Sequence, residues 1–399
     1  MTQIHLKVSV IALFLLQAGF SFAQGTSAGG YTLTGIVRGI SNGEVELSSY
    51  DSKNRTNTKI NTVKIENGRF VMTGKVKSPE MMGLLFKPGN WSMQLFVENS
   101  NISINIDTTG SEHYDYTKYG DTKGARLKNF KISGSVSQAD FEQYENNPVQ
   151  MSYLNKIMEI NKRFMAENSE EKKEAIRAEM TPFRTKNTEW QLKYIQQFLS
   201  KKPSSVAGAY MLSNYYMFNS EMPIAKMDQL LSAFTGEAKE SIYYRNLNSD
   251  LTQRKAVLPG NLAEDFTLLQ RDSTKFTLSS TRGKYVMIDF WASWCKPCRA
   301  AIPHWKEVYS KYKDKGFEIV SVTNDSRRVD WIKAMDVEQM PWIQTIDEFP
   351  VKMMPARVIS KYKHGTIPLY VLLDKEGKIL VKTGEEAEID QKLAEIFKN

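Results

Sequence analysis

Residues 285–299 of this 399-residue chain read YVMIDFWASWCKPCR, and this stretch decides how the C-terminal third folds. Its first seven residues form an apolar run typical of a buried strand, interrupted only by Asp289. The chain's only two cysteines, Cys295 and Cys298, follow at a spacing of three, and a helical pattern covers 303–312. A strand, Cys-x-x-Cys and a helix in this order predict a redox dithiol, because the free N–H groups of a helix N-terminus stabilise a thiolate.

Other interpretations of the cysteine pair fit less well. A structural zinc site needs four ligands, the chain has no second cysteine pair, and His304 and His364 do not have the required spacing. Covalent haem attachment needs a histidine after the second cysteine, where Arg299 stands. A purely structural disulfide would close a loop so short that it stabilises little.

Residues 289–299, DFWASWCKPCR, resemble the active site of the thioredoxin superfamily. The stretches PGNLAEDFTL (259–268), RGK (282–284) and GTIP (365–368) are similar to its TlpA/ResA-like branch of the bacterial cell envelope. The resemblance covers residues 259–399. It implies an α/β thioredoxin fold, with a central mixed sheet flanked by helices, and thiol–disulfide oxidoreductase activity that uses no metal or other cofactor.

Within 259–399 we expect an opening hairpin followed by the order β-α-β-α-β-β-α. The strands are predicted near 285–291, 317–323, 369–374 and 379–382, and the last helix over 388–397. Glu376-Gly377 is expected to turn the last two strands into a hairpin.

The cysteine motif assigns a role to each of its residues. We expect Cys295, at the exposed helix start, to attack a disulfide, and the more buried Cys298 to resolve the mixed disulfide. The two would form a redox-active disulfide. Lys296 and Pro297 are expected to set the redox poise and Trp294 to shape the surface that contacts the substrate.

A second group of predicted substrate-binding residues is Thr366, Ile367 and Pro368. In the superfamily this proline is cis and faces the cysteines, and the backbone before it pairs with a substrate segment as an added strand. The alternative is an ordinary trans proline at the start of a strand.

Two positions depart from the ResA-like pattern. That pattern often has Glu three residues after the second cysteine, where this chain has Ala301, and Asn six residues before the first cysteine, where this chain has Asp289. We expect the strand to bury Asp289 without a partner, which raises a carboxylate's pKa and suits it to carry a proton for Cys298. The alternative is a solvated, inert Asp at a strand end.

The N-terminus has the pattern of a secretory signal peptide over residues 1–23. His5 and Lys7 precede an apolar run over 8–16, and Ser21 and Ala23 occupy the −3 and −1 positions of a cut before Gln24. The run is too short for a stable membrane span. We therefore expect a protein of the periplasm or cell envelope, exported by a cleaved signal peptide.

Residues 24–136 carry the signals of a β-rich domain. Ile102, Ile104 and Ile106 alternate with polar residues, which indicates a strand with one buried face, and Asn67-Gly68 predicts a two-residue hairpin turn. This block resembles the small β-domain of unknown function that precedes TlpA-like domains in some envelope proteins.

Residues 137–258 carry helical signals. Leu192, Ile195 and Leu199 lie on one helical face, and Pro203-Ser204-Ser205 is expected to end one helix before another begins at Val206. We expect an aromatic cluster to be core, with a peptide-binding groove as the alternative: Tyr210, Tyr215, Tyr216 and Phe218.

The chain has 53 Lys and Arg against 45 Asp and Glu, which gives a formal charge of +8. These basic residues do not form a stripe interleaved with aromatic residues, so we expect no nucleic-acid partner.

We predict an exported reductase of protein disulfides, whose partners are disulfide or dithiol proteins and a membrane or periplasmic electron donor. Two alternatives stay open. One is an oxidant of secreted thiols, and the other is an envelope binding protein whose upstream domains recognise a ligand. No sequence feature specifies an oligomeric state.

Overall fold

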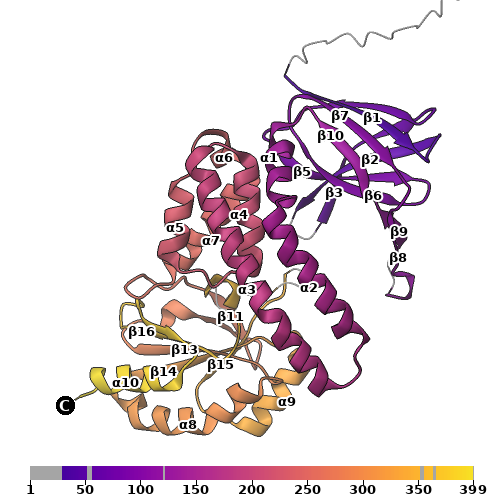
Figure 1. Ribbon diagram of the computed structural model, residues 1–399. Coiled ribbons are helices and arrows are strands. Elements are labelled where there is room, and N and C mark those ends of the chain that lie inside the picture. The colour runs from indigo at the N-terminus through magenta and orange to yellow at the C-terminus, as the bar shows by residue number, and fades with distance from the viewer. Residues whose placement is uncertain (1–28, 52–55, 120–121, 351–354, 363–364, 399) are drawn as a thin grey trace, which may run out of the picture.

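The computed structural model describes residues 29–51, 56–119, 122–350, 355–362 and 365–398. The predicted signal peptide over 1–23 lies outside them. The chain forms a β-rich N-terminal region, a helical middle region and a C-terminal region around a mixed sheet (Figure 1). Within the described part of the chain, no helix combines the length and apolar character needed to cross a membrane.

The N-terminal region consists of two sheets. One has the strand order β10-β7-β1-β4 and the other the order β3-β2-β5-β6-β9-β8. Their strands are β1 (Tyr31–Arg38), β2 (Gly43–Asp51), β3 (Thr56–Ile65), β4 (Arg69–Gly74), β5 (Glu80–Lys87), β6 (Trp91–Val97), β7 (Asn101–Asp107), β8 (Glu112–Asp115), β9 (Lys123–Arg126) and β10 (Asn129–Ser133).

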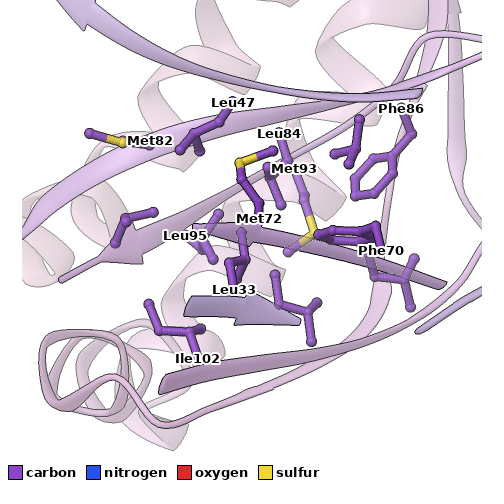
Figure 2. Packing of buried hydrophobic residues seen from close by; sticks show 14 of the residues in the cluster. Leu33, Leu47, Phe70, Met72, Met82, Leu84, Phe86, Met93, Leu95 and Ile102 are labelled. Carbon is purple, nitrogen blue, oxygen red and sulfur yellow. The ribbon is translucent and has the colours of Figure 1, made fainter. Parts of the chain in front are cut away.

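The inner faces of these strands share one apolar core, as the alternation in sequence predicts. Every second residue of β7 is buried, starting at Ile102, and packs with side chains such as Leu33, Leu47 and Leu84 (Figure 2). The predicted turn between β3 and β4 is present, and Asn67 and Gly68 have φ angles of 51° and 71°. These positive angles are those that a two-residue hairpin turn requires.

The middle region is helical. Its helices are α1 (Val136–Glu145), α2 (Pro148–Ala166), α3 (Glu170–Lys201), α4 (Val206–Phe218), α5 (Ile224–Ser232), α6 (Gly236–Glu240) and α7 (Ile242–Ala256). The predicted break falls between α3 and α4. Several hydrogen bonds join the region to the β-rich part. Among them, Met81 N–H donates to Tyr243 Oη at 2.7 Å, Phe96 N–H donates to Gln138 Oε1 at 2.9 Å, and Ser137 N–H donates to Glu98 Oε2 at 3.2 Å.

The predicted aromatic core of this region is correct for Tyr215, which is buried, and wrong for Phe218, whose exposed fraction is 85%. Tyr210 and Tyr216 are partly buried and pack against the same core. Phe218 is the last residue of α4, so its side chain lies where the helix ends and the chain turns away. The apolar pattern of a helix in sequence does not show at which residue the neighbouring helices cease to cover its apolar face.

The C-terminal region contains a seven-stranded sheet with the order β12-β11-β15-β14-β13-β16-β17. Its elements are β11 (Thr267–Gln270), β12 (Lys275–Thr277), β13 (Tyr285–Trp291), α8 (Lys296–Tyr312), β14 (Phe317–Thr323), α9 (Arg328–Glu338), β15 (Ile343–Ile346), β16 (Leu369–Leu373), β17 (Ile379–Thr383) and α10 (Glu386–Ile396). β13 runs parallel to β14 and antiparallel to β16.

Two features of this region differ from the sequence expectation. β15 was not predicted, because it has only four residues and two of them, Gln344 and Thr345, are polar. The helical pattern predicted from Pro303 begins earlier, at Lys296, and Pro303 lies inside α8. The longer helix brings its N-terminus to the cysteines.

The two faces of β13 belong to different cores. Met287 and Trp291 pack with buried residues of α8, α9 and α10. Ile288 and Phe290 pack on the other face, in a cluster that includes Val257 at the end of the helical region. The core of the C-terminal region is therefore continuous with the last helix of the middle region.

Candidate redox site

The two cysteines lie at the N-terminus of α8. Cys295 is the N-cap residue, and its Sγ accepts the Cys298 backbone N–H at 3.3 Å. The two sulfurs form a disulfide with an S–S distance of 2.03 Å. The helix N-terminus thus directs an unpaired N–H and the positive end of its dipole at the Cys295 sulfur, which stabilises a thiolate there.

Both cysteines are buried in this disulfide form, with exposed fractions of 5% for Cys295 and 3% for Cys298. Cys298 is the more buried of the two, as expected, but by a small margin, and the expected exposure of Cys295 is not found in this form. The neighbouring residues of the motif are exposed to solvent: Lys296 and Pro297 are exposed, and Trp294 is 63% exposed. Position on the helix, rather than exposure, is what distinguishes the two sulfurs.

The loop before β16 lies against Cys295. The Ile367 carbonyl oxygen is 3.8 Å from Cys295 Sγ, and the Ile367–Pro368 peptide bond is cis, as predicted. Thr366 is exposed, and Ile367 and Pro368 are half-buried. Residues that lie about 70 positions apart in sequence therefore meet at one sulfur, next to backbone that a substrate segment can reach.

The turn before the cysteines is held by a carboxylate that the sequence analysis missed. Asp325 accepts hydrogen bonds from Ser293 N at 2.9 Å, Ser293 Oγ at 2.7 Å and Thr323 Oγ1 at 2.6 Å. Asp325 itself is buried. A carboxylate two positions after a buried strand such as β14 is the sequence signal that could have identified it.

Asp289 is buried, as predicted, on the face of β13 that carries Met287 and Trp291 and packs against α8. The expectation that it has no partner is wrong. Ser321 Oγ donates to Asp289 Oδ2 at 2.7 Å, and the Trp342 indole N–H donates to Ser321 Oγ at 2.8 Å. Ser321 lies opposite Asp289 on β14, so strand register creates the pair.

Burial raises the pKa of Asp289 to about 6, and the hydrogen bond from Ser321 opposes part of that rise. A carboxyl group with this pKa exchanges its proton near neutral pH. Asp289 therefore has the protonation behaviour that a proton carrier needs, and it lies on the side of the sheet that packs against the cysteine helix.

The histidines weighed as possible zinc ligands do not join the cysteines. His304 Nε2 lies 3.0 Å from an Asp390 carboxylate oxygen on α10, and His364 is outside the described residues. Over the described ranges, no group of three or more His, Cys, Asp and Glu side chains is arranged to hold a metal ion.

Comparison with known proteins gives the family. Residues 259–382 match the AhpC/TSA family. The thiol-disulfide oxidoreductase ResA of Bacillus cereus is 32% identical over 127 residues, which are 31% of this chain and 68% of that protein. ResA of Geobacillus thermodenitrificans is 31% identical over 148 residues, 36% of this chain and 82% of that protein. The chain belongs to the ResA family of thiol-disulfide oxidoreductases.

The family match covers the C-terminal region, and residues 31–141 match a domain of unknown function, DUF4369. Among solved structures, the thioredoxin domain of a thiol-disulfide oxidoreductase from Bacteroides vulgatus is 28% identical and covers 35% of this chain and 97% of its own, with a TM-score of 0.31. A thiol-disulfide oxidoreductase from Bacteroides fragilis is 28% identical and covers 34% and 100%, with a TM-score of 0.32.

Proposed function

We propose that this thiol-disulfide oxidoreductase acts as a reductase of protein disulfides in the cell envelope, with Cys295 as the attacking thiol. The observation that carries the assignment is the position of Cys295 Sγ, which accepts the Cys298 N–H in the first turn of α8 and lies 3.8 Å from the Ile367 carbonyl oxygen. The sulfur with the helix-stabilised thiolate is thus also the one beside the substrate-binding loop.

The proposed reaction has two exchange steps. The Cys295 thiolate attacks one sulfur of the substrate disulfide, which forms a mixed disulfide and releases the other substrate sulfur as a thiolate. Cys298 then loses its proton to the Asp289 carboxylate and attacks Cys295 Sγ, which releases the second substrate thiolate. Two electrons pass from the protein dithiol to the substrate, and the Cys295–Cys298 disulfide remains. An electron donor of the envelope would then reduce it.

Single-cysteine variants test the assignment of the attacking thiol. Cys295→Ser should abolish the reduction of a protein disulfide such as insulin, whereas Cys298→Ser should accumulate a mixed disulfide that non-reducing electrophoresis detects. Comparable trapping by both variants would contradict the assignment.

The reduction potential tests the direction of electron flow. Equilibration with a series of dithiothreitol redox buffers should give a value near that of thioredoxin, roughly −270 mV. A value near that of the strong oxidant DsbA, roughly −120 mV, would instead identify an oxidant of secreted thiols.

We also propose that the protein is exported and cut before Gln24, which the signal-peptide pattern over residues 1–23 supports. Mass spectrometry of the native protein from the envelope fraction should find a mature N-terminus at Gln24. A full-length cytoplasmic form as the main species would contradict export.

A further inference from the structure

The turn between α4 and α5 carries the most exposed large apolar side chain in the described part of the chain. Phe218 is 85% exposed and its neighbour Met217 is 63% exposed. Residues earlier in α4, such as Met211 and Leu212, are completely buried. The helix therefore changes from a packed core element to an uncovered apolar end within two turns.

Hydrogen bonds hold this turn in place. Asn219 N–H donates to the Tyr216 carbonyl at 3.0 Å, and Met222 N–H donates to the Asn219 carbonyl at 3.1 Å. From α7, the Arg254 guanidinium donates to the Met222 carbonyl at 2.7 Å and to Tyr216 Oη at 3.1 Å. Met217 and Phe218 are thus presented by a fixed backbone, which lowers the entropic cost of binding through them.

The same turn reaches the loop that touches Cys295. A Cβ atom placed on Gly365 would lie 3.9 Å from Glu221 Oε1, so the Glu221 carboxylate lies beside the residue that is two positions before Ile367. The charges of Arg254 and Glu221 also act on Lys382 of β17. Burial lowers its pKa, with Arg254 adding to this effect and Glu221 opposing it. Figure 1 shows α4, α5 and α7 standing over the C-terminal sheet.

Chain geometry bounds the distance from Phe218 to the cysteines. Phe218 and Glu221 are three positions apart in sequence, and Gly365 and Ile367 are two positions apart. Even with both segments and the Glu221 side chain fully extended, the Phe218 Cα atom lies at most about 35 Å from Cys295 Sγ. An ordinary protein interface buries about 800 Å² on each partner, which is a patch roughly this wide. At this upper limit a small disulfide bound at Cys295 cannot reach Phe218, whereas about ten residues of extended chain can.

We propose that Met217 and Phe218, together with Trp294 at the cysteine motif, form an apolar docking surface for an extended segment of the substrate protein. The occupant is a segment that carries large apolar side chains up to about ten residues from its reactive cysteine. This inference rests on the proposed function, and it assigns to the helical region a role in selecting the substrate. Continuity with the Ile367 loop favours the substrate itself over an unrelated partner.

The experiment uses two synthetic disulfide peptides and the full-length protein in its dithiol form. The peptides are identical except that one has Leu-Phe and the other Ser-Asn at six to eight residues from the cysteine. Stopped-flow fluorescence gives the second-order rate constant for each peptide. The wild-type protein should prefer the apolar peptide by about tenfold, equal to about 1.4 kcal/mol. Phe218→Ala should bring this ratio close to one, and Phe218→Leu should keep most of it.

Tyr116→Ala is the matched control, because Tyr116 is an aromatic residue that is 50% exposed and directly follows β8 in the β-rich region. It should leave the ratio unchanged. Equal rates for both peptides in the wild type, or a ratio that survives Phe218→Ala, would overturn the proposal. A wild type that reacts with neither peptide nor with a small aromatic disulfide would instead refute the proposed function, and the docking proposal would fall with it.

A second copy or a membrane are the other possible occupants of this surface. Sedimentation equilibrium and flotation with anionic lipid vesicles test them with the same variants. If Phe218→Ala abolished dimerisation or vesicle binding but left the peptide ratio intact, the surface would belong to that other occupant and the proposal would be wrong.

Discussion

Replacing Asp289 by Asn should stabilise the disulfide form of the protein at neutral pH. The pKa of Asp289 rises from 3.8 to about 6 in the folded protein, so the folded state binds this proton more tightly than the unfolded state. The free energy of unfolding therefore falls as pH increases from 3.8 to about 6. Above about pH 6, the whole cost of burying the ionised carboxylate lowers the free energy of unfolding. A shift of this size corresponds to about 3 kcal/mol. Asn carries no charge to bury and still accepts the hydrogen bond from Ser321.

Urea denaturation of both proteins at several pH values measures this difference. Asp289→Asn should be more stable by up to about 3 kcal/mol at pH 7.5, and the gain should shrink steadily towards pH 4. Asp325→Asn is the control, because that buried carboxylate accepts three hydrogen bonds and its loss should destabilise the protein. A gain for Asp289→Asn that does not change with pH would refute the reasoning.

The same substitution should slow the resolving step of disulfide exchange by about 10²-fold, the usual scale of acid–base assistance. Rapid-quench trapping should show the mixed disulfide persisting in Asp289→Asn at pH 7. A pH–rate profile identical to that of the wild type would show that Asp289 is not the proton carrier.

Further predictions concern the neighbours of Asp289. Ser321→Ala removes the hydrogen bond that lowers the Asp289 pKa, so that pKa should rise above about 6 in a carbon-13 NMR titration of the carboxyl group. Trp342→Phe leaves Ser321 without its indole donor and weakens it as a donor in turn, so the Asp289 pKa should rise by a smaller amount. Combining Ala301→Glu with Asp289→Asn should restore part of the exchange rate in stopped-flow assays, because Ala301 is buried in the same cluster as Cys298.

The parts of the site that sequence predicts are those encoded by neighbouring residues. A continuous apolar run gives the central strand β13, and a cysteine pair directly before a helix gives an N-terminus at Cys295. The role of Pro368 came from resemblance to a known motif rather than from local propensity. For the strand and the helix start, the residues that determine the feature lie within a few positions of it.

The parts that sequence did not predict depend on residues that meet only in the folded chain. Asp289 gains its partner because β13 and β14 pair in register, which places Ser321 opposite it, 32 positions away. Trp342 joins them only because the short, half-polar strand β15 inserts between β11 and β14. No periodicity in either strand contains this information.

The exposure of Phe218 has the same origin and connects the helical region with the chemistry. In sequence it is one of several aromatic residues in an apolar helix, and burial was the natural expectation. It is uncovered because α4 ends there and Arg254 fixes the following turn, in which Glu221 lies beside Gly365 of the Ile367 loop. Burying an exposed Phe is favourable, so a partner that covers Phe218 gains binding free energy. On this proposal the helical region binds the substrate, and the cysteines of the C-terminal region carry out the disulfide exchange.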